Sequence, residues 1–502
     1  MKWMIIYAAG ALSTLSQQCI ESGINLESIS YYSHINPFIN MAKLSEEWRR
    51  PKESSKAYVP LSLTEDRYVK ELEGDGDHAV SIVSVKFQNH SFGERRYTLL
   101  FDGDGDIEFH YVKPKIISRG ENRIDVEFDD KVGALALRID AVKSDDPIRN
   151  IRLVPTKKIS DLSDKVYNEN FKDLIRPFSV VRLMDFNVTN NNKQSAWEDR
   201  PTVSQYGRNA VALEDMVALA NELKVRPWFN IPHLADDRYV RQMADYVAAN
   251  LDPELSVFVE YSNEVWNHSF EQARWASKQA ERQGISPEKF YVLKSARVLS
   301  IWRSAFNDDT SRVKGVLGAQ LGNSWRTKQM LKSVDDPDST FDVLAVNYYL
   351  GGIVGSPEMA ERTLELGNAE LFEYLETIEL PKLRVALRDQ KKLAKKHGME
   401  LVAYEAGQHL VGHGASDALG GYLPDNAELT SKLIGLNQDA RIAELYDKMI
   451  DVWLEEGGGL INWFRLTGNN GKWGSWGMVN VKDSSAAGSP KYHSVLKRTC
   501  AR

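Results

Sequence analysis

Short apolar runs alternate with amphipathic helical patterns along most of the chain after residue 172. Seven such runs occur before residue 466, and a helical segment separates most neighbouring runs. Their apolar residues occupy consecutive positions, which is typical of strands buried on both faces of a parallel sheet. The runs are 177–184, 225–231, 256–262, 313–320, 342–349, 399–405 and 460–466.

An eighth strand completes the pattern near the N-terminus. The run GINLESISYYS (23–33) supplies it, and PFINMAKLSEEW (37–48) predicts the helix that follows. Eight strands with helices between them predict an α/β fold, the closed (β/α)8 TIM barrel. From 55 to 165 the runs instead become short and alternating, with Gly, Asp and Asn turns, which is typical of antiparallel sheets. We therefore predict a β-sandwich-like domain at 55–165, inserted after a first β/α unit at 22–54, with the rest of the barrel at 166–502.

The first 21 residues carry a pattern with two interpretations. One lysine is followed by about ten mostly apolar residues and then by small and polar ones, which fits a short signal peptide. The same pattern fits a buried strand or helix in an N-terminal extension. A cleaved signal would remove Cys19 and leave Cys500 without a partner. It would also indicate an extracellular or periplasmic protein, whereas its absence would indicate a cytoplasmic one.

Composition narrows the classes of partner. With 42% hydrophobic and 26% charged residues, this is an ordinary globular chain. Its net charge of -7 argues against nucleic acid or an anionic membrane as the main partner. No other stretch approaches the roughly 20 apolar residues of a membrane span. The two cysteines form no CxxC or Cys/His pattern, so no metal site is expected.

Polar residues gather at the C-terminal ends of the predicted strands, where barrel enzymes carry their working residues. Glu264 and Glu405 stand out because each ends an apolar strand and so bears a desolvation cost. Two carboxylates at one barrel mouth suit acid/base and nucleophilic work on a glycosidic bond. The other candidates at these strand ends are Arg182, Asp185, His233, Asn263, Gln320, Tyr348, Tyr349 and Trp463.

The stretch EYSNEVWN (260–267) and the second glutamate give a resemblance to a known family. The chain resembles the clan A glycoside hydrolases, in the broad family 5-like group of (β/α)8 retaining β-glycosidases. The resemblance rests on Asn263-Glu264 at the fourth strand and Glu405 at the seventh, with support from Arg182 and from Trp463 at the eighth. EYSNEVWN and the early GINL also resemble a subgroup of bacterial proteins described as cellulose-binding or cellulase-like. The resemblance covers the barrel, roughly two-thirds of the chain.

The resemblance implies a role for each residue and requires no cofactor. Glu264 would be the general acid/base and Glu405 the nucleophile, kept ionised by Arg182 and a tyrosine hydroxyl. Asn263 would bind the sugar 2-hydroxyl, and Trp463 would be the stacking floor. The sixth strand reads NYY instead of a His-x-Tyr arrangement, so either tyrosine can face inward, and Tyr348 is the one predicted. Asp185, His233 and Gln320 are substrate contacts by position.

Each assignment has a structural alternative. The glutamates could be ion pairs that cap strands, Arg182 an ion-pair partner inside the barrel, and His233 a structural histidine. Trp473 and Trp476 fit loop packing as well as a sugar platform. A barrel that binds glycan without cleaving it is the alternative function. Sugar, linkage and endo or exo action depend on loop geometry, and the oligomeric state has no signal in the sequence.

Overall fold

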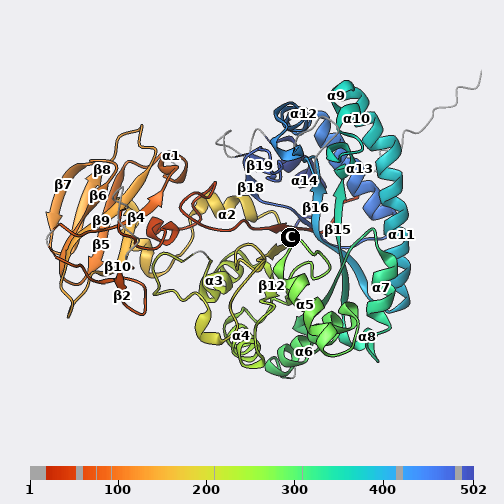
Figure 1. Cartoon of the computed structure of the whole chain (residues 1–502), viewed down its shortest axis with the longest axis horizontal. Coiled ribbons are helices and arrows are strands. Elements are labelled where there is room, and N and C mark those ends of the chain that lie inside the picture. The colour runs from red at the N-terminus through yellow and green to blue at the C-terminus, as the bar shows by residue number, and fades with distance from the viewer. Residues whose placement is uncertain are drawn as a thin grey trace, which may run out of the picture.

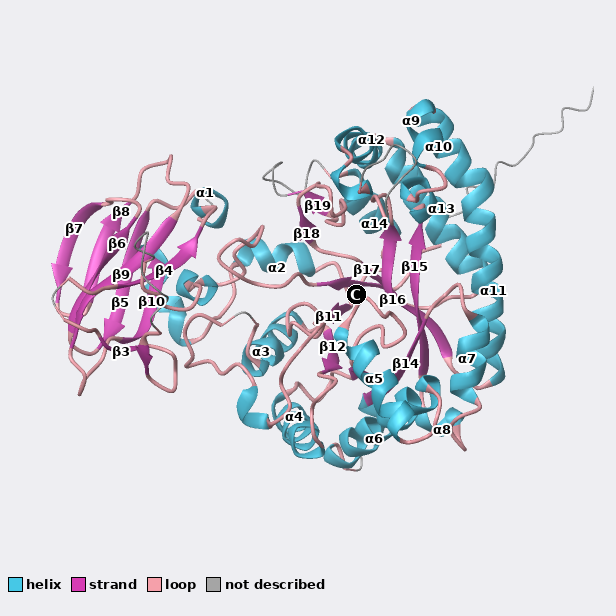
Figure 2. Cartoon of the chain, viewed as in Figure 1, coloured by secondary structure: helices cyan, strands magenta, loops and turns pink. Residues whose placement is uncertain are grey.

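Eight parallel strands close into a barrel in the computed structural model of the chain, which describes residues 18–51, 60–74, 76–91, 93–208, 210–307, 309–413, 422–480 and 489–502. Each strand pairs with the next, and the first pairs with the last, so the ring is closed. The predicted (β/α)8 barrel is confirmed (Figure 2). In order, the strands are β1 (Ser22–Asn25), β11 (Val180–Arg182), β12 (Arg226–Ile231), β13 (Val257–Tyr261), β14 (Val313–Ala319), β15 (Val343–Leu350), β16 (Glu400–Gln408) and β17 (Ile461–Trp463).

Helices surround the barrel and bury one apolar stripe each against it (Figure 1). In α13 (Arg441–Glu455), for example, Leu445, Met449 and Val452 are buried. Among the described residues, no helix has the length and apolarity needed to cross a membrane. The other helices of the barrel half are α2 (Glu169–Ile175), α3 (Leu213–Leu223), α4 (Asp237–Asn250), α5 (Glu271–Arg282), α6 (Pro287–Ala305), α7 (Ser324–Leu331), α8 (Pro337–Thr340), α9 (Ala360–Glu365), α10 (Asn368–Tyr374), α11 (Leu380–Lys396), α12 (Ala427–Gln438) and α14 (Pro490–Arg498).

The interior of the barrel is filled by side chains at alternate strand positions. Trp228 on β12 stacks on Phe258 of β13 with ring centroids 5.0 Å apart. Seven more side chains complete this layer, namely Val180, Val316, Val343, Ala345, Val402, Tyr404 and Leu460. The barrel is therefore closed below its mouth, and only the C-terminal ends of the strands are left to bind a ligand.

The β-module, strands β2 to β10, lies beside the barrel, at the left in Figure 1. Two antiparallel sheets, ordered β10-β5-β8-β7 and β4-β9-β6, face each other across an apolar layer. Phe109 and Phe128 meet edge to face in that layer, with centroids 5.5 Å apart. The strands are β2 (Ser62–Leu63), β3 (Val69–Glu71), β4 (Ala79–Ser84), β5 (Arg96–Asp102), β6 (Gly105–His110), β7 (Lys115–Gly120), β8 (Arg123–Glu127), β9 (Leu135–Val142) and β10 (Arg149–Pro155), and α1 (Phe87–His90) follows β4.

The helix predicted at 37–48 is wrong. Only a short 3-10 turn, Met41–Leu44, forms there. The apolar residues of this segment pack on both sides instead of along one helix face: Phe38 meets Tyr167, and Trp48 stacks on Tyr206 at 5.1 Å. The first helix of the barrel itself after β1 is thus α2, beyond the β-module and its short helix α1. The module interrupts the first β/α unit and does not follow it.

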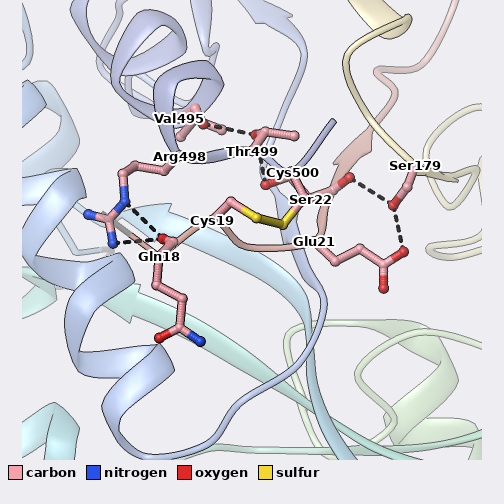
Figure 3. Close-up of a disulfide and its surroundings, with 9 residues drawn as sticks. All are labelled: Gln18, Cys19, Glu21, Ser22, Ser179, Val495, Arg498, Thr499 and Cys500. Atoms are coloured by element: carbon pink, nitrogen blue, oxygen red, sulfur yellow. Dashed lines mark hydrogen bonds between the residues drawn. A yellow bond between two sulfur atoms is a disulfide. The ribbon is translucent and has the colours of Figure 1, made fainter. Parts of the chain in front are cut away.

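A disulfide joins the two ends of the described chain (Figure 3). Cys19 bonds Cys500 across a sequence separation of 481 residues. Backbone hydrogen bonds flank it, from the Ile20 amide to the Arg498 carbonyl and from the Cys500 amide to the Ile20 carbonyl. Residues 18–21 therefore belong to the folded protein. Residues 1–17 of the segment predicted to be a signal peptide or an N-terminal extension lie outside the described residues.

Candidate active site

A buried arginine connects the strands at the mouth of the barrel. Arg182 ends β11 and is 0% exposed. Its Nη1 donates to Glu405 Oε1 at 2.8 Å, and its Nη2 donates to Glu260 Oε2 at 2.9 Å and to Asn263 Oδ1 at 2.8 Å. Nη1 also donates to Asn25 Oδ1 at 3.1 Å. A buried guanidinium is tolerated only when its charge and its donors are matched, and here two carboxylates and two amides match them.

Glu260 is a buried residue of this cluster that the sequence reasoning missed. It is 1% exposed, and its Oε2 also accepts from Trp228 Nε1 at 2.9 Å and from Asn230 Nδ2 at 2.7 Å. With these fixed donors it acts as a counter-ion that orients Arg182. The available signal was a glutamate within the apolar run LSVFVEYS, because a charge in a buried strand needs a partner.

Glu405 lies beside this arginine and is 6% exposed. Its Oε2 accepts the hydroxyl of Tyr349, on the neighbouring strand β15, at 2.9 Å. Burial raises the pKa of Glu405 to about 8, and the charge of Glu264 adds to the rise, whereas Arg182 and the Tyr349 hydroxyl oppose it. Among the described residues, the guanidinium of Arg182 thus contacts Glu405 and not Glu264.

Glu264 follows β13 in a strained turn. Ser262 and Glu264 have φ angles of 60° and 42°, left-handed values that non-glycine residues adopt rarely. The carboxyl group accepts two neutral donors at 2.9 Å, the hydroxyl of Tyr404 and the side-chain amide of Asn267. Burial raises the pKa of Glu264, and these hydrogen bonds oppose the rise.

A bulge in β16 brings the two carboxyl groups together. Along the β15–β16 pair the register runs from Ala403 directly to Glu405, so Tyr404 is an extra residue on β16. Tyr404 and Glu405 therefore both face the interior although they are adjacent. Tyr404 bonds Glu264, and the guanidinium of Arg182 lies 5.0 Å from its ring centroid.

Two predicted contacts point away from the mouth, and their placement is corrected. Tyr348 is fully buried outside the barrel, where its hydroxyl donates to a backbone carbonyl of α13 at 2.8 Å. Trp463 is also fully buried outside, against Tyr446 of α13 at 5.4 Å, so it cannot be a sugar floor. Successive strand residues face opposite sides. The inward positions belong to their neighbours Tyr349 and Phe464.

The remaining predicted residues divide between the site and its surroundings. Asn263 contacts Arg182, as described. Asp185 Oδ2 lies 3.8 Å from Arg465 Nη1. Burial raises the pKa of Asp185, and the charges of Arg465 and Arg182 oppose this rise. His233 is buried against Trp275 of α5, and burial lowers its pKa to about 4. Gln320 accepts a bond through its backbone carbonyl. Within the described residues, no hydrogen bond or ion pair joins the side chain of His233 or Gln320 to the two carboxyl groups.

Four rings form an aromatic wall next to Glu405: Tyr349, His409, Phe464 and Trp476. The Trp476 ring centroid lies 5.7 Å from that of Tyr349, 5.1 Å from that of His409 and 5.9 Å from that of Phe464. Trp473, the other tryptophan of its loop, is 62% exposed. Of the two, Trp476 is thus the one placed beside the carboxyl groups, whereas the sequence reasoning did not include His409 or Phe464.

No protein-family model and no curated protein sequence matches the chain. Solved structures do match it, at low sequence identity. The catalytic core of a xylanase A is 10% identical, with a TM-score of 0.40 over 66% of this chain and 92% of that one. A Bacteroidetes-affiliated GH5 cellulase is 11% identical, with a TM-score of 0.39 over 67% and 85%. The GH51 arabinofuranosidase from Xanthomonas axonopodis pv. citri is 12% identical, with a TM-score of 0.37 over 66% of this chain and 65% of its own length. The barrel assignment rests on the strand pairing of this chain itself.

Proposed function

We propose that the protein is a retaining β-glycoside hydrolase that acts on a polysaccharide or an oligosaccharide. One observation carries the proposal. Two carboxyl groups, the part-buried Glu264 and the buried Glu405, stand at one barrel mouth with different partners among the described residues, a guanidinium and a phenol for Glu405 and two neutral donors for Glu264. Cleavage of a glycosidic bond through a covalent intermediate requires one protonated carboxyl group as acid and one ionised carboxylate as nucleophile.

The partners decide which carboxyl group carries the proton. Two negative charges in one buried site repel each other, so the pair holds one proton over a wide pH range. Arg182 stabilises the anion of Glu405, so the negative charge resides there. Burial raises the pKa of both carboxyl groups, that of Glu405 to about 8, so burial does not decide between them and the assignment rests on the guanidinium beside Glu405. Glu264 is therefore the acid and Glu405 the nucleophile.

The reaction follows in two steps. Glu405 attacks the anomeric carbon while Glu264 gives its proton to the leaving oxygen, and the glycosidic bond breaks as the glycosyl ester forms. Glu264, now ionised, then takes a proton from water, whose oxygen attacks the same carbon and releases Glu405. Both attacks invert the carbon, so the product keeps the β configuration.

Asn263 is positioned to contact the sugar during these steps. Its Oδ1 is held by Arg182, and its Nδ2 donates to Asn190 Oδ1 at 3.0 Å. We include in the proposal that Nδ2 turns to the sugar 2-hydroxyl, a bond that strengthens in the transition state. Asn190 then acts as the partner that orients the amide before the sugar binds.

Turnover on a panel of aryl β-glycosides and plant and microbial polysaccharides tests the proposal. Proton NMR of the first product anomer gives the stereochemistry, and the β anomer is expected. Glu264→Gln is the matched variant because it keeps the shape of the side chain but cannot transfer the proton. Glycan binding without turnover, or an α anomer as first product, would overturn the proposal.

We also propose that the protein works in an oxidising compartment, outside the cytoplasm. The support is the Cys19–Cys500 disulfide, because such bonds persist in secreted and periplasmic proteins and are rare in the cytosol. Peptide mapping of the protein from its native cells, with and without reductant, tests this. Free thiols at both cysteines, in protein trapped with an alkylating agent, would contradict it.

A further inference from the structure

A buried lysine lies behind the aromatic wall, on a helix that the proposed mechanism does not use. Lys491 is the second residue of α14 and is 5% exposed. Its Nζ donates to the backbone carbonyl of Ser475, in the tryptophan loop (471–478), at 2.7 Å. It also donates to Asn437 Oδ1, on α12, at 3.3 Å. Both acceptors are neutral, and in the described part of the chain no carboxylate pairs with this lysine.

This side chain lowers the stability of the folded protein at neutral and acidic pH. Burial lowers the pKa of Lys491 to about 7. Between about pH 7 and 10 the unfolded chain therefore binds a proton that the folded protein does not, so the free energy of unfolding rises with pH across this range. An apolar side chain of the same length would avoid this loss. A buried group that opposes folding indicates a contribution other than stability.

The Ser475 carbonyl connects this lysine to the strand of the proposed nucleophile. Gln408 is the last residue of β16, three positions after Glu405. Its Nε2 donates to the same carbonyl of Ser475 at 2.9 Å, and its Oε1 accepts from Asn437 Nδ2 at 3.4 Å. Two donors, Lys491 from α14 and Gln408 from β16, thus hold one carbonyl of the tryptophan loop.

Trp476 follows Ser475 directly, so the position of this carbonyl determines that of the next side chain. The indole lies over Gly474, where a Cβ would collide with it. On its other side, the ring centroid of Trp476 lies 5.7 Å from that of Tyr349, whose hydroxyl bonds Glu405. Both rings are partly exposed. A sugar that Glu405 attacks therefore lies within reach of the Trp476 ring.

We propose that Lys491 is a positioning residue for saccharide binding, which fixes the Trp476 ring at the sugar-binding surface by holding the Ser475 carbonyl. The proposal rests on the glycoside hydrolase function above. Lys491 is buried and does not itself contact the sugar. Its removal should weaken binding without changing the bond-breaking steps, because none of its partners exchanges a proton or forms a bond with the substrate. The effect should therefore appear in KM and not in kcat.

Replacement of the lysine by a side chain of similar length tests this split. Lys491→Met removes the donor, and the substrates are the aryl β-glycoside and the polysaccharide that the native protein cleaves fastest. We expect KM to rise by about 2–10-fold, the net effect of one hydrogen bond, with kcat within about twofold. Lys432→Met, on α12, is the matched control, because its Nζ also donates to a backbone carbonyl, that of Leu366, which is not part of the wall. It should leave both constants unchanged.

A double-mutant cycle with Trp476 separates positioning from a general structural role. Trp476→Ala removes the ring and should itself raise KM. In that background Lys491→Met should change KM by less than about twofold. An unchanged KM in the single variant, or an equal rise in both backgrounds, would overturn the proposal. Gln408→Met removes the other donor to the Ser475 carbonyl, and the same cycle with it tests this carbonyl as the anchor of the ring if Lys491→Met does not fold.

Failure of the glycosidase function itself gives a different result, since the native protein then cleaves no member of the panel. Fluorine NMR of protein labelled with 5-fluorotryptophan tests the positioning role in that case. The signal of Trp476 is assigned by its loss in Trp476→Phe. A shift or broadening of this signal in Lys491→Met, and not in Lys432→Met, would support the positioning role, whereas an unchanged signal would overturn it.

Discussion

Replacing Tyr349 by phenylalanine should shift the pH dependence of activity. Within the part of the chain that the structure describes, the hydroxyl of Tyr349 and the guanidinium of Arg182 are the two donors to Glu405. A hydrogen bond to a charged group is worth about 1.5–3 kcal/mol. Since one pKa unit is about 1.36 kcal/mol, its loss should raise the pKa of Glu405 by about 1–2 units.

The sign of the shift follows from the role of Glu405. As nucleophile it must be ionised, so activity rises with pH through the lower apparent pKa of the carboxyl pair. A donor lost from the anion makes ionisation harder and moves this limb to higher pH. We expect the low-pH limb of kcat/KM on an aryl β-glycoside to move up by about 1–2 units in Tyr349→Phe.

Tyr348→Phe is the matched control in the same strand. Its hydroxyl bonds a carbonyl of α13 outside the barrel, so its removal should cost about 1–3 kcal/mol of unfolding free energy. The pH profile should stay as in the native protein, whereas urea unfolding should show the loss of stability. An unmoved limb in Tyr349→Phe, or a moved limb in Tyr348→Phe, would refute the assignment of the inward tyrosine.

Three other substitutions address the acid, the nucleophile and the disulfide. Glu264→Gln should lower polysaccharide turnover by about 10²–10⁴-fold and spare the glycosylation step of substrates with good leaving groups; unchanged polysaccharide turnover would contradict the acid role. Glu405→Ala should be inactive, and azide should partly restore turnover of an activated β-glycoside with the α-glycosyl azide as product by NMR; a β-azide would mean that the two roles are reversed. Cys19→Ser should lower the unfolding free energy by about 2–5 kcal/mol in urea with kcat unchanged, and an unchanged urea midpoint would refute the stabilising role of the bond.

The barrel could be predicted because its strands are buried on both faces. Such strands can be recognised from their consecutive apolar residues even when their neighbours in the sheet are unknown. All eight strands pair in the order in which they occur along the chain. The helix predicted for 37–48 does not form, because its apolar residues could not be assigned to one buried face without knowledge of their partners. Its apolar residues are spaced as in a helix, but the β-module and the barrel bury them from both sides, and only the tertiary structure supplies that second surface.

Both carboxyl groups that the sequence singled out lie at the barrel mouth, where their catalytic roles stay predictions, whereas two aromatic residues were predicted on the wrong face of their strands. In a strand that is apolar on both faces, hydrophobicity does not show which alternate residues point inward, so Tyr348 and Trp463 were indistinguishable from Tyr349 and Phe464. The polar residue Asn347, two positions before Tyr349, was the available signal. The bulge at Tyr404 has no signal in the sequence, because it depends on the register with β15.

The closure of the barrel has a consequence for biosynthesis. Asn25, on β1, bonds the carbonyl of Trp463, on β17, across 438 residues, and the Cys19–Cys500 disulfide lies beside the same seam. The strands of the β-module are contiguous and can fold as they are made, but β1 has no partner on this side until β17 has been synthesised. A nascent barrel therefore exposes two open sheet edges, which invite pairing with other chains. Because Cys19 and Cys500 lie 481 residues apart in sequence, their disulfide can form only after nearly the whole chain, β17 included, has been synthesised.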